Sequence, residues 1–196
     1  MEEVRRQGFS EQELESAVAV IAMFNYFTRV ADASGIDFDY QTPLPAFEPD
    51  LDQVSAPRPI ASVVVAPGAD DGDAAGRRAL GHEGLRAAWA SWRAYLLDSV
   101  EPLSRSDRLL LVRVAAEEAA DRATAEAHGS PAGAAGHVLA GFARKLSREP
   151  WQMQAADLEK LRASGYSEIA VLQAISVTAH QNADSRLSAG LAAARI

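Results

Sequence analysis

Hydrophobic residues recur at helical spacing in the first part of the chain. The segment SEQE offers Ser10 as an N-cap with Glu13 three residues later, which is the pattern of a capping box. Gly35 is a residue type that commonly ends helices. We therefore predict a helix from Ser10 to Gly35, with the following apolar positions on one side: Leu14, Ala17, Val18, Ile21, Phe24 and Val30.

The same periodicity returns after residue 77. A helix is predicted through Trp89 and Trp92 and is interrupted at Pro102. Ser104 and Asp107 then form a second capping pattern, which predicts a long helix that reaches about His128. Further helices are predicted at about 133–148, at 155–163 and from 167 to near the C-terminus.

The intervening segment is different in composition. Six prolines and the small, acidic run GADDGDAAG lie between about residues 37 and 76. The run IASVVV has no obvious partner strand, so we predict extended packing there and not a sheet. The predicted organisation is an N-terminal helical repeat (1–36), a Pro/Asp/Gly-rich linker (37–76) and a helical domain (77–196).

Two distant segments are similar to one another. The 32 residues from Val4 align without gaps with those from Leu161, so that each position corresponds to the one 157 residues later. The alignment pairs Gly8 with Gly165 and Ser10 with Ser167, and it matches an Asn-x-x-x-Arg pair in both segments. A shared turn, capped start and polar pair indicate a duplicated unit.

Composition limits the kinds of partner. The net charge is −8 and there is no clustered Lys or Arg, so we expect no nucleic-acid partner and no anionic membrane surface. No apolar run is long enough for a membrane span, and we recognise no secretory signal. The chain has no cysteine, which fits a cytoplasmic location and excludes disulfides and thiol catalysis.

Three segments resemble the alkylhydroperoxidase D-like (carboxymuconolactone decarboxylase) family. FNYFTRVAD is similar to the closing helix of its peroxidase-related members. GFARKLSREP followed by LRASGYSE resembles the segment ahead of that helix, and LSRSDRLLLVRVAAEEAADRATAEAHG resembles the active-site helix. The resemblance covers about residues 8–35 and 85–194. It implies an all-α fold, an alkylhydroperoxidase D-like helical bundle with an internal helix repeat.

The residues that carry the family's chemistry are largely absent. Its active site uses a Glu followed by Cys-x-x-Cys-x-x-x-His, where one thiolate attacks the peroxide and the second resolves the product. The alignment places Leu109 at the Glu position, Asp121 and Thr124 at the cysteine positions, and His128 at the His. The resemblance therefore implies a peroxidase-related protein that has lost its peroxidatic site. Its expected role is that of a small-molecule-binding or assembly subunit.

Four polar residues follow one stripe of the predicted long helix: Glu117, Asp121, Thr124 and His128. They could form a pocket for a small cationic or hydroxylated ligand, with Glu117 and Thr124 as binding residues. They could also hold a divalent metal, although helical spacing of these residues is a weak metal signal. The purely structural interpretation is a solvent-exposed polar helix face, with His128 near the C-terminus of the helix. We expect no metal and no cofactor.

An enzyme without redox chemistry is the main alternative, with His128 and Asp121 as candidate catalytic residues for proton transfer. Asn182 and Arg186 are candidate binding residues if they face a cavity, although a structural role is the simpler interpretation. We expect a homo-oligomer, a dimer or a multiple of one, because Ile21, Phe24 and Phe27 make a large apolar face. A small-molecule ligand is a further expected partner. A third possible function is that of a regulatory partner of a cysteine-containing paralogous family subunit.

Overall fold

A computed structural model describes residues 2–36, 80, 83–128 and 136–194. Within these residues the regular structure is entirely helical, with no strand, which confirms the all-α prediction. The predicted linker, including IASVVV, lies outside the described residues. The helices are α1 (Glu2–Arg6), α2 (Glu11–Ser34), α4 (Glu83–Leu97), α5 (Arg105–Glu118), α6 (Arg122–Ala127), α7 (Val138–Arg148), the 3₁₀ helix η3 (Pro150–Gln152), α8 (Ala155–Ala163) and α9 (Glu168–Ala194).

The predicted start and end of α2 are confirmed. Ser10 Oγ accepts a hydrogen bond from the backbone N–H of Glu13 at 3.3 Å, and the Glu13 carboxylate accepts one from the Ser10 N–H at 2.8 Å. The reciprocal pair satisfies two backbone donors that the first helical turn leaves open. Gly35 ends the helix with φ of 62°, a left-handed conformation that glycine adopts without strain.

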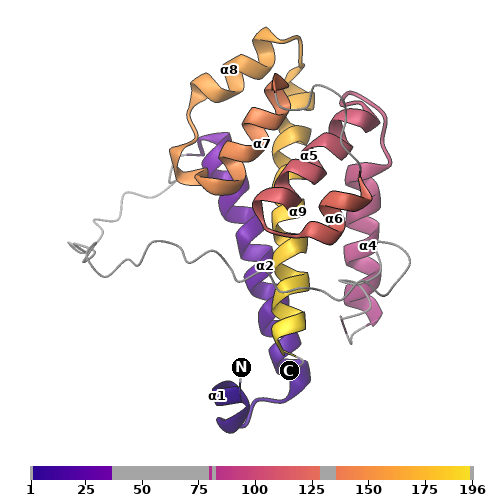
Figure 1. Cartoon of the computed structure of the whole chain (residues 1–196), viewed down its shortest axis with the longest axis vertical. Coiled ribbons are helices and arrows are strands. Elements are labelled where there is room, and N and C mark those ends of the chain that lie inside the picture. Colours follow the sequence, from indigo (N-terminus) through magenta and orange to yellow (C-terminus); the bar gives the residue numbers. More distant parts are fainter. Residues whose placement is uncertain (1, 37–79, 81–82, 129–135, 195–196) are drawn as a thin grey trace, which may run out of the picture.

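Helix α9 forms the centre of the bundle. It runs antiparallel to α2, while α4, α5 and α7 pack around the remainder of it (Figure 1). Its side chains are buried along most of its length, which explains why α9 shows little amphipathic character. The main core lies between α5, α7 and α9 and includes these fully buried residues: Leu111, Leu139, Leu146, Leu161 and Ala174.

The turns before α2 and α9 have the same backbone geometry, as the repeat predicts. Gly8 has φ of 93° and Gly165 has φ of 94°. Side chains are strained at such angles, so both copies of the turn require glycine. The short helix α1 precedes Gly8 in the way that α8 precedes Gly165.

The two repeated helices also pack on one another in a symmetrical way. A side chain at Gly190 would lie 2.5 Å from Val18 Cγ1, so the helices approach closely at this point. The repeat equivalents of Gly190 and Val18 are Ala33 and Ile175, and these two are buried in one core cluster. The antiparallel pair is therefore organised about an approximate two-fold axis, as expected of a duplicated helix.

The predicted long helix from Ser104 to His128 is wrong. Helix α5 ends at Glu118, Ala120 has φ of 60°, and α6 begins at Arg122. Asp121 caps α6 by accepting a hydrogen bond from the Thr124 N–H at 3.2 Å. A short polar side chain that bonds to the local backbone in this way competes with a continuous helix.

The starts of two other helices differ from the prediction in detail. Ser104 Oγ accepts a hydrogen bond from the Asp107 N–H at 3.1 Å, but its hydroxyl, and not its backbone N–H, meets the Asp107 carboxylate at 2.8 Å. Only half of the predicted capping box therefore forms. Helix α7 begins at Val138 with His137 as its N-cap, later than the predicted start near residue 133, which lies outside the described residues.

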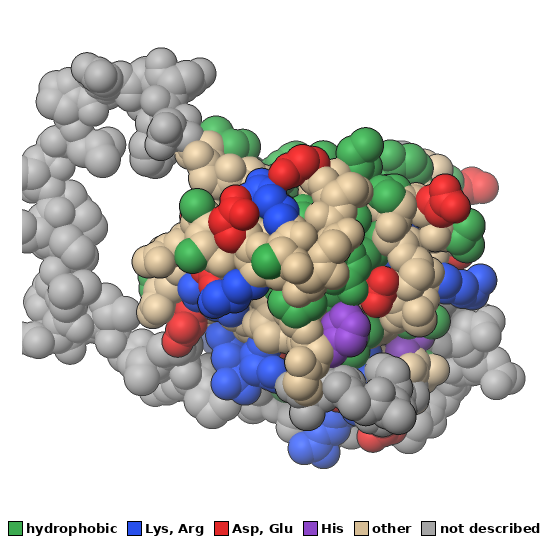
Figure 2. Space-filling model, turned by 90° about the horizontal axis from the view of Figure 1, so that it is seen from above, with side chains coloured by type: hydrophobic (Ala, Val, Ile, Leu, Met, Phe, Trp, Pro, Cys, Tyr) green, Lys and Arg blue, Asp and Glu red, His purple; other side chains and the backbone are tan. Residues whose placement is uncertain are grey.

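Charged side chains are interspersed at the end of the molecule where α8 lies. Figure 2 shows acidic, basic and apolar side chains in alternation on this face, without a large patch of one kind. Arg162 forms ion pairs with Glu159 and Glu168, and Asp157 is bound by Lys145 and Lys160. These paired charges leave no concentrated basic surface on this face.

Candidate functional site

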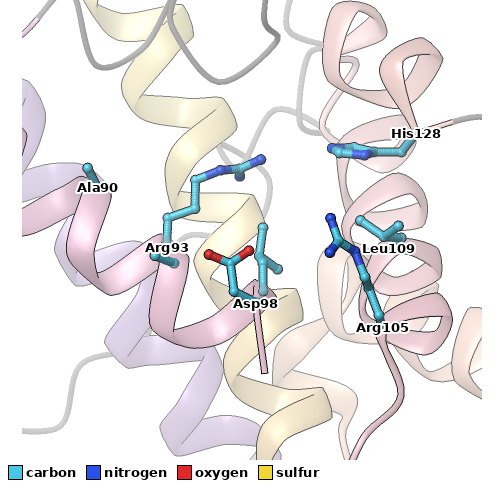
Figure 3. Close-up of a pocket in the computed structure, with 8 residues that line it drawn as sticks. Ala90, Arg93, Asp98, Arg105, Leu109 and His128 are labelled. Carbon is cyan, nitrogen blue, oxygen red and sulfur yellow. The ribbon is translucent and has the colours of Figure 1, made fainter. Parts of the chain in front are cut away.

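A pocket of about 260 Å³ lies between α4 and α5, next to the end of α6. Arg93 projects into it from α4, while Arg105 and His128 point toward it from the opposite wall (Figure 3). Asp98 follows the end of α4 and also faces the space. The remaining lining residues are apolar: Ala90, Ala94, Leu97 and Leu109.

Two of the four positions singled out by the family resemblance line this pocket. The resemblance aligns Leu109 with the family's Glu and His128 with its His, and both residues line the pocket. They are brought together because α6 folds back after the break at Ala119 and Ala120, so that its C-cap residue lies beside α5. The break that was not predicted is therefore what places His128 at the pocket.

His128 has a pKa below the ordinary histidine value of 6.5. Partial burial favours the neutral imidazole, and the positive charge of Arg93 acts in the same direction. The negative charge of Asp121 opposes these effects without cancelling them. His128 is therefore neutral near pH 7 and can both donate and accept a hydrogen bond.

Asp121 does not line the pocket. Its Oδ1 accepts the hydrogen bond from the Thr124 N–H, and its Oδ2 accepts one from the Ser185 hydroxyl at 2.8 Å. The carboxylate is thus paired with α9 through Ser185, a residue that the sequence analysis did not single out.

The two other members of the predicted stripe are also directed elsewhere. Glu117 is exposed and forms an ion pair with Arg113 at 2.7 Å, one turn earlier on α5. Thr124 is the buried residue of α6 and is only 6% exposed. The four residues therefore do not form one face, because the helix that would have aligned them is interrupted.

Asn182 and Arg186 have partners within the fold. The Asn182 amide donates to Ser147 Oγ at 2.8 Å and to the Thr178 carbonyl at 3.0 Å, which links α9 to α7. Arg186 donates to Asn182 Oδ1 at 3.3 Å. This pattern supports the structural interpretation of the pair.

The equivalent pair in α2 is less completely satisfied. Arg29 donates to the Ser147 carbonyl at 3.0 Å, while its Nε and the Asn25 Oδ1 are buried without a hydrogen-bond partner among the described residues. Burial and the nearby charge of Arg186 lower the Arg29 pKa to about 10. Ser147 thus accepts a hydrogen bond from each copy of the repeat, from Arg29 at its carbonyl and from Asn182 at its hydroxyl.

Sequence reasoning missed Arg93, Asp98 and Arg105. They lie on two helices that are separate in sequence and adjacent only in the folded chain, so no spacing pattern connects them. Arg93 did carry a weak signal, since an arginine beside Trp92 and Leu96 interrupts the apolar side of a helix. Arg93 is 9% exposed, and a buried arginine on such a face often has a binding or pairing role.

A second cavity of about 340 Å³ lies beside α7 and α8. Its two lysines, Lys145 and Lys160, both bind the carboxylate of Asp157. These contacts hold the pKa of Asp157 below its usual range, although burial opposes them. Both lysines of this cavity thus have an ion-pair partner within the protein.

Several comparisons bear on the class of protein. Within the described ranges, no group of three or more His, Asp or Glu residues is close enough to hold a metal ion. None of the described helices is long and apolar enough to cross a membrane. No protein-family model, no curated protein and no solved structure matches the chain.

Proposed function

We propose that this chain binds a small molecule in the pocket beside His128, and that it is a peroxidase-related, alkylhydroperoxidase D-like protein without thiol chemistry. The observation that supports this function is the cavity itself. It combines four apolar residues with a few polar groups that converge on it, which is the usual composition of a ligand site. Leu109 and His128 line it, and both stand at positions where the resembled family has active-site residues.

The geometry favours binding over proton transfer between His128 and Asp121. Both carboxylate oxygens of Asp121 accept hydrogen bonds from protein groups, and neither residue donates to the other. Only His128 lines the pocket. The absence of cysteine removes the sulfenic acid intermediate that thiol peroxidases require.

A fragment screen by two-dimensional amide NMR tests the binding function. We expect bound fragments to shift the signals of Ala94, Leu109 and His128. Leu109→Trp fills the cavity and should lower the affinity of those fragments about tenfold or more. Leu172→Trp, at an exposed position of α9, is the matched control and should not change their affinity. Fragments that bind equally well to both variants, or a screen without binders, would exclude this function.

Self-assembly through α2 is a second proposed property. One side of α2 packs on α9, while the opposite side leaves large apolar side chains in solvent. These residues are more than half exposed, which is unusual for four neighbouring apolar residues on one helix. They are Val20 (54%), Ile21 (66%), Phe24 (64%) and Phe27 (55%).

A second copy of the chain suits this face better than a charged partner. The exposed residues from Ala17 to Ala31 are uncharged, because the charged residue of this stretch, Arg29, is buried. An uncharged apolar face can pack against a second copy of itself. Two copies related by a two-fold axis would present the same patch to one another. Such a contact removes apolar surface from water on both copies at once.

Sedimentation velocity over a range of protein concentrations tests the assembly. We expect the wild type to dimerise and Phe24→Glu to shift the chain to monomer. Tyr95→Glu places the same charge on α4 at an exposed aromatic residue and should leave the dimer intact. A wild type that stays monomeric, or equal disruption by both variants, would contradict assembly through α2.

A further inference from the structure

Building on the binding function proposed above, we propose that the pocket beside His128 takes a small molecule that carries a carboxylate. Arg93 and Arg105 approach the cavity from opposite walls, α4 and α5 (Figure 3). A guanidinium group presents paired N–H donors that match the geometry of a carboxylate. The polarity is thus the reverse of the cationic ligand that the acidic residues of the sequence suggested.

The charged groups of the lining favour an anionic ligand over a cationic one. The guanidinium groups of Arg93 and Arg105 and the carboxylate of Asp98 line the cavity, and His128 is neutral near pH 7. The chain as a whole carries a net charge of −8. Two arginines that converge on one cavity of an acidic protein distinguish this cavity from the general surface.

The other lining residues indicate the body of the ligand. Ala90, Ala94, Leu97 and Leu109 form an apolar wall beside the charged groups. Neutral His128 adds an imidazole that can donate to a carboxylate or accept from a hydroxyl. A short hydrocarbon or aromatic acid therefore fits the chemistry of both walls, and a volume of about 260 Å³ limits it to a small one.

Three isosteric probes of different charge provide the test, with binding measured by calorimetry on the full chain at pH 8. Benzoate, benzamide and benzamidinium have nearly the same shape and carry a negative, a neutral and a positive group. We expect benzoate to bind at least about tenfold more tightly than benzamide, because only benzoate meets both arginines as an anion. Benzamidinium should not bind measurably.

Arg105→Gln separates a specific contact from general electrostatics. Arg105 is exposed, so the variant should fold normally, and benzoate affinity should fall about tenfold. Arg122→Gln removes the same charge from an exposed arginine of α6 that does not line the cavity, and it should change affinity less than about twofold.

Three results would overturn the carboxylate inference. The first is that benzamide or benzamidinium binds as tightly as benzoate. The second is that the two arginine variants lower the affinity for benzoate equally. The third is that none of the three probes binds. The fragment screen decides the binding function independently of these results. Neutral fragments that respond to Leu109→Trp would keep the function while the carboxylate inference fails.

Discussion

Helices α2 and α9 have related sequences and opposite surroundings. The exposed apolar residues Ile21 and Phe24 of α2 correspond to Thr178 and Gln181 of α9, which are completely buried. Thus the polar residues of α9 are buried and the equivalent apolar residues of α2 are exposed to solvent. This is the reverse of what the hydrophobic effect alone would favour. This reversal is the reason for the proposed assembly through α2.

The partners of the α9 face are visible. Thr178 donates to the Ala174 carbonyl at 2.8 Å, and Gln181 donates to Ser185 at 3.0 Å. Ser185 then donates to Asp121, which caps α6. The polar face of α9 therefore holds α6 in place, and α6 carries His128 to the pocket.

The same charge introduced at equivalent repeat positions should have very different consequences. Gln181→Glu places a carboxylate in the interior next to Ser185, which already donates to Asp121, and should destabilise the fold by about 3–5 kcal/mol. Phe24→Glu, at the exposed equivalent position, should change monomer stability by less than about 0.5 kcal/mol. Urea unfolding at pH 8 measures both. Similar losses in the two variants would show that the faces do not differ in this way.

Removing the link between α9 and α6 should have a smaller effect. Asp121→Ala takes away the cap of α6 and leaves the Ser185 hydroxyl without its acceptor, with an expected loss of about 1–3 kcal/mol. Thr28→Ala, at the α2 position equivalent to Ser185, is the control and should be nearly neutral because Thr28 is exposed. An Asp121→Ala variant as stable as the wild type in urea would refute the proposed link.

The smallest expected effect is a pH dependence that comes from His128. Its pKa in the folded chain lies below 6.5, so the unfolded chain binds more protons as the pH falls. Stability should therefore decrease below pH 6.5 and level off below the lowered pKa. His128→Gln should flatten this part of the profile measured by urea unfolding between pH 7 and 5. An unchanged slope would mean that His128 does not experience the surroundings described.

Local signals in the sequence predicted much of the fold. Capping at Ser10, the glycines at 35 and 165, and the repeat predicted α2, α8 and α9 and their common turn. The break after Glu118 was not predictable, because the run of Glu and Ala around it favours a helix in every local measure. Asp121 was the one available signal, as a residue type that caps helices.

The candidate site was predicted only in part. The family resemblance pointed to Leu109 and His128, which both line the pocket. Arg93 and Arg105 belong to the same site only because α4 packs beside α5, and sequence spacing does not reveal such a contact. Glu117 and Asp121 looked like site residues because an uninterrupted helix was assumed.

The most direct test of the ligand site is the pKa of His128, followed by NMR with and without benzoate. The four histidines can be resolved by their imidazole signals, and His128→Gln assigns the relevant one. A carboxylate bound between Arg93 and Arg105 adds a negative charge next to the imidazole, so saturating benzoate should raise the pKa of His128 alone. A His128 pKa that stays the same while benzoate is bound would contradict a carboxylate site in this pocket.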